Sequence, residues 1–147
     1  MKQFEFAYYR LNGDANISRC YRTLYTFLGN STIHLIDCNA KLKGNLFKAR
    51  NAHKILRYEK ISDFFDSNQD AQIIIFERNG KLNFDKFSES HLLKQRIIVF
   101  IGEGNPLFPL SKYPDLLRIK ITTNKDLLII GSAITALISY KLNKWNK

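Results

Sequence analysis

The sequence has little of what secreted, membrane-spanning or metal-binding proteins need. It contains two cysteines, Cys20 and Cys38, which are too few for a disulfide framework or a set of paired metal ligands. Both fall in apolar patterns and are expected to be buried thiols of an intracellular protein in a reducing compartment. Residues 1–5 lack the long apolar stretch of a secretory signal. The longest apolar run, Leu127–Ile138, is too short for a bilayer span of about twenty residues, so no membrane partner is expected.

Familiar catalytic signatures are also missing. The three histidines, His34, His53 and His91, are far apart without metal-ligand spacing, so no metal site is expected. His34 alternates within a strand pattern and is interpreted as a surface or structural residue. No feature of the sequence singles out a particular Ser, His and Asp as a catalytic triad. The glycines of the segment 102–106 lack the third glycine of a dinucleotide fingerprint, and no phosphate-cradling Lys/Ser pair is present.

Positive charge is what the sequence has in excess. There are 23 Lys and Arg residues against 13 Asp and Glu, a formal net charge of +10. Such a surface attracts phosphate backbones or anionic lipid head groups through a salt-dependent term, and a nucleic acid is the expected partner. With 45% hydrophobic and 13% aromatic residues, the 147 residues can bury one core, and they are expected to form a single domain, 1–147.

The basic residues concentrate in the segment 41–60. The predicted RNA-binding residues are Arg19, Lys41, Lys43, Lys48, Arg50, Lys54 and Arg57. Phe47, His53 and Tyr58 interleave with these cations and could stack on bases. A solvated loop of a lysine-rich protein would have the same composition, and both interpretations stay open.

Hydrophobic patterns predict alternating strands and helices. An aromatic strand is expected at 4–9, followed by a helix over 17–28 with Asn16 as its N-cap. The β-branched runs at 71–76 and 96–101 are typical of parallel strands that are covered on both faces. Further expectations are strands at 32–37 and 116–121, a loop with a short helix in 41–60, a short helix at 61–65, a polar excursion over 78–94, and a final helix from Asp126 to about Asn143. This order predicts an α/β, three-layer, mostly parallel sheet.

The first helix carries an unusual set of polar residues near its start. Asn16, Arg19 and Arg22 lie in its first two turns, where a cation opposes the helix dipole at a cost of about 0.5 kcal/mol. This placement suggests a use, although a solvated arginine is an equally open interpretation. Ligands of parallel sheets bind beyond the carboxyl ends of strands, which directs attention to the loops 12–16, 102–106 and 122–126.

Taken together, these pieces resemble the SpoU branch of the knotted SPOUT RNA methyltransferases. The likeness covers nearly the whole chain and is strongest to small single-domain members that methylate a ribose 2′-hydroxyl in the tRNA anticodon loop. The segment 16–23 is similar to the family's first motif, an Asn followed six residues later by an Arg. The segment 33–37 is similar to the next strand, 99–104 to the second motif, and 117–121 with 128–140 to the third.

This resemblance implies a C-terminal trefoil knot, S-adenosylmethionine as cofactor, an RNA substrate (tRNA or rRNA) and a homodimer. Arg22 would act at the ribose hydroxyl, and Asn16 would help to order the site. The implied cofactor-binding residues are Phe76, Gly102, Glu103, Ile119, Ile121 and Leu128.

Several positions depart from the family's pattern. Ser18 stands where the first motif usually has Gly, and the second motif, at 102–107, is shortened. In the third motif Lys120 replaces Pro, and the apolar segment 128–130 replaces Ser-x-Asn. These replacements favour an alternative hypothesis, a catalytically degenerate protein that binds RNA or assists ribonucleoprotein assembly. A basic domain that acts through protein contacts alone is a third.

Overall fold

The computed structural model describes residues 2–11, 13–29, 32–39, 54–77, 79–102, 112–113, 116–121 and 131–146. The strands are β1 (Gln3–Tyr9), β2 (Ile33–Ile36), β3 (Ile55–Tyr58), β4 (Gln72–Phe76), β5 (Leu82–Asn83), β6 (Arg96–Ile101) and β7 (Leu117–Lys120). The helices are α1 (Asp14–Leu28), α3 (Ile61–Asp66) and α4 (Gly131–Trp145), with short 3-10 helices at Phe84–Lys86 and Glu89–His91.

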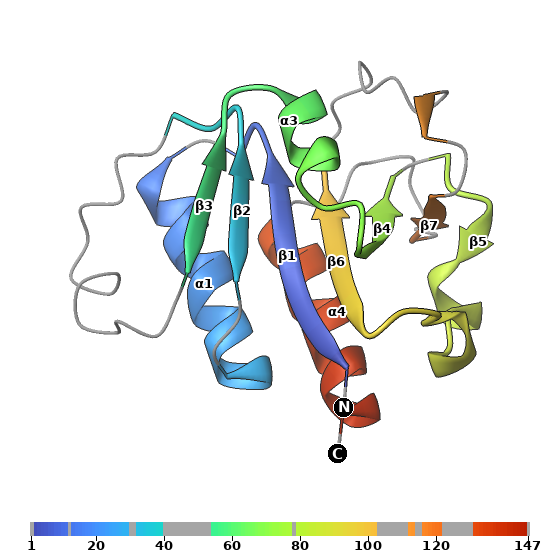
Figure 1. The fold of residues 1–147 in the computed structure, drawn as a ribbon. Helices are drawn as coiled ribbons and strands as arrows, with labels where there is room; N and C mark the ends of the chain where they lie inside the picture. Colours follow the sequence, from blue (N-terminus) through green and yellow to red (C-terminus); the bar gives the residue numbers. More distant parts are fainter. Residues whose placement is uncertain are drawn as a thin grey trace.

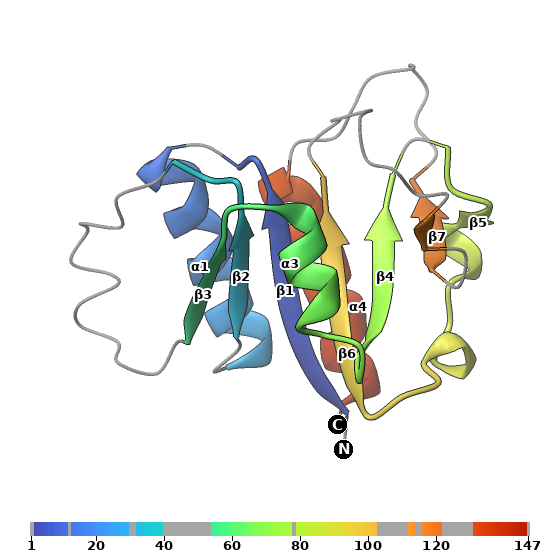
Figure 2. The same cartoon turned by 45° about the horizontal axis from the view of Figure 1, so that its top comes forward.

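The strands form one seven-stranded sheet in the order β3-β2-β1-β6-β4-β7-β5. Every neighbouring pair is parallel. Helices α1 and α4 cover one face of the sheet, and α3 lies on the other (Figures 1 and 2). The predicted three-layer α/β architecture is therefore confirmed, with a sheet that is parallel throughout its described strands.

The strand order reverses beside β1. The chain moves from β1 to β2 and β3 in one direction, whereas β6, β4, β7 and β5 lie on the other side. In doubly wound sheets a ligand-binding crevice lies outside the carboxyl ends of the two strands that flank such a switch point. Here those strands are β1 and β6, which pair with Tyr8 opposite Ile101.

Helix α1 begins two residues earlier than the N-cap position predicted for it. Gly13, at φ 90°, precedes the first helical residue, Asp14, so Asn16 lies inside the first turn and is not the N-cap. Glycine tolerates positive φ, and the chain can therefore turn into the helix directly after the loop. The predicted end is confirmed, because Gly29 follows Leu28 at φ 71° and its amide binds the carbonyl of Tyr25.

The segment 55–58 is a strand, and the prediction of a loop with a short helix is wrong there. β3 pairs in parallel with β2, with Ile33 opposite Ile55. It is an edge strand, where charged side chains such as Lys54 and Arg57 are common because they discourage pairing with another chain. Because of these charged residues, the segment 55–58 does not show the apolar pattern by which a strand is predicted from sequence. Residues 40–53 of the same basic segment lie outside the described residues.

The other predicted elements match the structure, with small changes. Strands β1, β2, β4, β6 and β7 and helix α3 lie where they were expected. The polar excursion 78–94 contains the short strand β5, which pairs with β7. Helix α4 extends to Trp145, and the predicted start at Asp126 lies outside the described residues.

Two apolar clusters fill the space between the layers. The larger one lies between the sheet and the helices α1 and α4, and it includes the buried rings of Tyr8 and Tyr21. The Tyr8 hydroxyl lies 2.8 Å from the Thr135 hydroxyl of α4, so this buried polar group is satisfied. The smaller cluster contains Phe64 and Phe65 of α3. No helix among the described residues has the length and apolar character to cross a bilayer.

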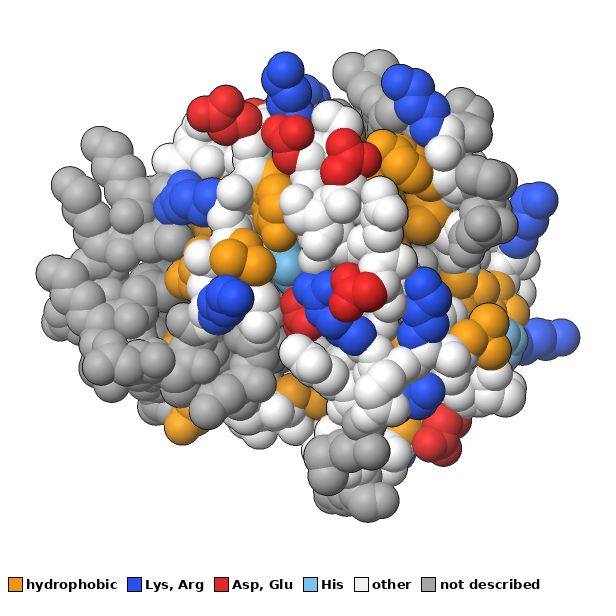
Figure 3. All heavy atoms as spheres, in the orientation of Figure 1, with side chains coloured by type: hydrophobic (Ala, Val, Ile, Leu, Met, Phe, Trp, Pro, Cys, Tyr) orange, Lys and Arg blue, Asp and Glu red, His pale blue; other side chains and the backbone are white. Residues whose placement is uncertain are grey.

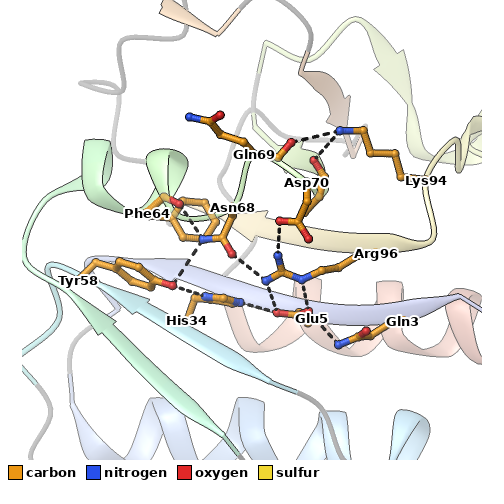
Figure 4. Close-up of polar contacts among 11 residues, drawn as sticks. Gln3, Glu5, His34, Tyr58, Phe64, Asn68, Gln69, Asp70, Lys94 and Arg96 are labelled. Carbon is orange, nitrogen blue, oxygen red and sulfur yellow. Dashed lines mark hydrogen bonds and ion pairs between the residues drawn. The ribbon is translucent and has the colours of Figure 1, made fainter.

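A buried ionic network joins the amino-terminal halves of the strands (Figure 4). The Glu5 side chain, 3% exposed, accepts hydrogen bonds from Arg96 Nε at 2.6 Å and Nη2 at 3.0 Å. His34 Nε2 lies 2.7 Å from Glu5 Oε1. Because a carboxylate only accepts, Nε2 carries the proton. Arg96 also binds Asn68 at 2.7 Å and Asp70 at 2.8 Å, so the network connects β1, β2 and β6 to the turn after α3.

Tyr58 belongs to the same network. Its hydroxyl lies 3.0 Å from His34 Nδ1, and its ring stacks on His34 at a centroid distance of 5.8 Å. Its ring also meets Phe64 edge-on. Tyr58 is therefore a packing residue of β3, and the prediction that it stacks on bases is not supported by this placement. His34 is fully buried, so the structural interpretation of this residue is confirmed and the surface interpretation is wrong.

We predict that Glu5→Gln lowers the free energy of unfolding by about 3 kcal/mol at neutral pH, because it removes the buried carboxylate that binds both Arg96 and His34. Burial raises the pKa of Glu5, but the hydrogen bonds from His34 and Arg96 outweigh it and lower the pKa from 4.5 to about 2. The carboxylate thus stabilises the fold above pH 4.5, and this contribution is lost as the pH falls toward 2.

Urea unfolding at neutral pH and at about pH 3 tests this prediction. The exposed Glu59→Gln is the matched control and should behave like the wild type. A Glu5→Gln protein as stable as this control at neutral pH would show that the network does not stabilise the fold.

Candidate functional site at the carboxyl ends of the strands

Three neighbouring strands bring the predicted cofactor residues to one edge of the sheet. Phe76, the last residue of β4, pairs with Ile101 of β6 on one side and with Ile119 of β7 on the other. Gly102 follows Ile101 directly, and Ile121 follows β7. The sheet register thus places the four described members of the predicted cofactor set side by side.

These residues differ in how far a ligand could reach them. The side chains of Phe76 and Ile119 are buried in the larger core, where Phe76 meets Phe84 edge-on at 6.0 Å. These two side chains therefore pack beneath the edge as part of the core and are less accessible to a ligand. Gly102 and Ile121 are half-buried at the edge itself. The other two members of the set, Glu103 and Leu128, lie outside the described residues.

A turn and an ion pair reinforce this edge. The Glu77 amide binds the carbonyl of Ile119 at 2.9 Å, and the Arg118 guanidinium forms an ion pair with the Glu77 carboxylate. Gly80 packs directly on β7, because a Cβ at this position would lie 2.5 Å from the carbonyl carbon of Ile119. The segment after β4 is thereby held against β7, at the place where the chain leaves both strands.

The predicted catalytic residues lie on the outer side of α1. Asn16 and Arg22 are exposed, whereas Cys20, Tyr21 and Leu24 of the same helix face the core. Arg19, the third polar residue of the motif, donates to Asn16 Oδ1 at 3.4 Å. The structure thus brings Asn16 and Arg19 together and leaves Arg22 exposed on α1.

The residues that end β1 and β2 form a feature that sequence analysis missed. Arg10 and Asp37 have φ values of 57° and 51°, and they are the non-glycine residues with positive φ in the described part of the chain. Such a conformation costs roughly 1–2 kcal/mol per residue. Arg10 Nε donates to Asp37 Oδ2 at 2.8 Å, and the side chains are 41% and 46% exposed. This hydrogen bond raises the pKa of Arg10.

The predicted RNA-binding residues are only partly described. Lys54 and Arg57 are exposed on the edge strand β3, and Arg19 is exposed on α1. Lys41, Lys43, Lys48 and Arg50 lie outside the described residues. On the face that carries α3, acidic and basic side chains of the described residues are mixed (Figure 3). The excess of positive charge is therefore not concentrated on the described part of this face.

Solved structures with a similar fold include RNA methyltransferases. No protein-family model and no curated protein matches the sequence. A Bacillus anthracis protein assigned as an RNA methyltransferase aligns over 96% of this chain and 92% of its own, with a TM-score of 0.71 and 22% identity. The AdoMet-bound SpoU methyltransferase AviRb from Streptomyces viridochromogenes aligns over 99% of this chain, with a TM-score of 0.72 and 8% identity. The chain has the SpoU-type methyltransferase fold.

A third structure with a similar fold concerns the 2-OH methylation of C/U34 on tRNA. It aligns over 99% of this chain and 93% of its own, with a TM-score of 0.67 and 12% identity. This chain spans 62% of the length of AviRb. The predicted SpoU-type knot concerns the segment 96–131, of which residues 103–111, 114–115 and 122–130 lie outside the described residues.

We predict that Gly80→Ala destabilises the protein by about 1–3 kcal/mol, because the added methyl group would overlap the backbone of β7. Chemical denaturation measures the change. The neighbouring, exposed Asn79→Ala is the control and should cost less than about 0.5 kcal/mol. Equal stability of the two variants would mean that the segment after β4 does not press on β7 as described.

Proposed function

We propose that the protein is an S-adenosylmethionine-dependent RNA 2′-O-ribose methyltransferase that acts on tRNA or rRNA. The observation that carries this proposal is the edge formed by Phe76, Gly102, Ile119 and Ile121, which lies on a SpoU-type fold beside the switch point of the sheet. The formal net charge of +10 supports an RNA substrate.

The residues at this edge fit a cofactor with an adenine ring and a sulfonium-bearing side chain. Gly102 has no side chain, and a methyl group added at this position would meet Phe100 Cε1 at an ordinary contact distance of 3.8 Å. The backbone at this point can therefore be approached closely. Apolar residues back the edge from the core, as is typical of cofactor sites.

S-Adenosylmethionine, when bound, supplies a methyl group on a sulfonium, which is already reactive toward an oxygen nucleophile. The protein then has to hold the ribose hydroxyl in line and to stabilise the negative charge that grows on its oxygen. We assign this role to Arg22, with Asn16 ordering the same face of α1. Both side chains are exposed and accessible to a substrate.

A homodimer would bring Arg22 of one subunit to the cofactor edge of the other. An apolar stripe on α4 supports this arrangement. Ala133, Leu137 and Tyr140 follow helical spacing on the side away from the buried residues Ile138 and Leu142. Leu137 is 43% exposed and Tyr140 is 52% exposed. Tyr140 also meets Phe27 of α1 edge-on at 6.1 Å, so the stripe continues toward the helix that carries Arg22.

We predict that the protein binds S-adenosylmethionine in calorimetry and transfers its methyl group to the ribose of unfractionated tRNA or rRNA. Arg22→Ala should lower kcat at least about 100-fold with unchanged cofactor affinity, because it removes stabilisation of the transition state only. Lys86→Ala, an exposed charge change elsewhere, is the control. Unchanged turnover in Arg22→Ala would refute its role. No heat at millimolar cofactor, with tRNA binding that weakens steeply with salt, would favour the degenerate RNA-binding alternative.

We predict further that Tyr140→Glu weakens dimer formation at least about tenfold, because a buried interface aromatic often dominates the energy of association. Sedimentation velocity over a dilution series measures the effect. Leu93→Glu is the control, because Leu93 is 79% exposed and lies outside α4. Dissociation of both variants to the same extent, or of neither, would contradict the α4 interface.

A further inference from the structure

We infer that Arg10 is a positioning residue that binds a backbone phosphate of the RNA substrate beside the cofactor edge. This inference rests on the proposed function and adds a contact that the family-like motifs at 16–22 and 99–104 do not contain. It is carried by three observations: the place of Arg10 at the switch point, the strained backbone that holds it there, and the two contacts that orient its guanidinium.

The place of Arg10 follows from the register of the sheet. Tyr8 of β1 lies opposite Ile101 of β6, so the two strands end next to one another. Arg10 follows β1, and Gly102 follows β6. Both residues therefore lie at the edge of the sheet where doubly wound folds bind their ligands. A group bound by Arg10 would be one strand away from the cofactor edge.

The backbone of Arg10 is held in an unfavourable conformation by its neighbours. Its amide binds the carbonyl of Ile36 at 2.9 Å, and the amide of Asp37 binds the carbonyl of Tyr58 at 2.8 Å. These bonds fix positive φ at the ends of two adjacent strands, where glycine would be less strained. Retained strain of this kind clusters at sites that bind ligands or substrates.

Two contacts orient the guanidinium. Asp37 Oδ2 accepts from Nε at 2.8 Å, and the centre of the guanidinium lies 5.0 Å from the centroid of the Tyr9 ring. Tyr9 itself is buried. A guanidinium oriented in this way loses little freedom on binding, and its planar fork matches phosphate oxygens. The side chain is still 41% exposed, so a phosphate can reach it.

The carboxylate of the cofactor is the other anion that could meet Arg10, and the experiment separates the two. Filter binding of end-labelled, unfractionated tRNA and calorimetry with S-adenosylmethionine are measured on the full chain. Arg10→Ala should weaken tRNA binding about 3–10-fold, as expected for one lost phosphate contact, and should leave cofactor affinity unchanged. Arg10→Lys keeps the charge without the fork and should stay at least about threefold weaker than wild type.

Two controls make the result specific. Lys86→Ala removes one positive charge near β5, at the far end of the sheet order from β1, and should change tRNA affinity less than about twofold. Arg10→Gly removes the side chain and relieves the backbone strain, so its unfolding temperature should not fall while its tRNA affinity drops as in Arg10→Ala.

Three results would overturn the inference: tRNA affinity of Arg10→Ala equal to that of Lys86→Ala, full recovery by Arg10→Lys, or loss of cofactor affinity with tRNA binding intact. Each can occur in a protein that still transfers methyl groups. Conversely, failure of methyl transfer in the wild type would count against the proposed function without changing the comparison of tRNA affinities among these variants.

Discussion

The register of β1 against its two neighbours is the constraint on which the rest of the structure depends. Glu5 sets it, because its carboxylate is bound by His34 from β2 and by Arg96 from β6. A slip by one residue would turn Glu5 toward the other face of the sheet and break its contacts with His34 and Arg96. The same register aligns Tyr8 with Ile101 at the other end of the strands, and thereby defines the edge at which Arg10 and Gly102 meet the surroundings.

A network of this kind specifies an arrangement more than it adds stability. Moving a carboxylate, a guanidinium and an imidazole out of water is costly, and their mutual attraction offsets the cost only when every partner is present. Here Arg96 also binds Asn68 and Asp70, so the turn after α3 depends on the same ions as the strands. Apolar residues in these places could pack as well, but they would tolerate more than one register.

Much of the fold could be predicted, and the failures have physical causes. The strands 72–76 and 96–101 were readable because β-branched runs suit a sheet covered on both faces. Strand β3 was not, because an edge strand can carry cations that also suit a loop. The network was invisible, since Glu5 and Arg96 are 91 residues apart. At the site, Gly102 could be identified because a glycine follows an apolar strand. Arg10 could not be identified, because an arginine in the sequence does not indicate a backbone with positive φ.

The two ends of the sheet differ in their contributions to stability: one end holds paired charges, and the other holds a strained backbone. At the amino-terminal ends, the buried Glu5 is paired with His34 and Arg96, and no described non-glycine residue there has positive φ. At the carboxyl ends, the described residues Arg10 and Asp37 hold an unfavourable backbone in exposed positions. A marginally stable protein can retain such strain only if the surrounding ladder over-determines the conformation. The bonds from Arg10 to β2 and from Asp37 to β3 have this effect, and both depend on strands that Glu5, His34 and Tyr58 hold in register. The side-chain contacts that hold β1, β2 and β3 in register therefore also hold the unfavourable backbone of Arg10 and Asp37.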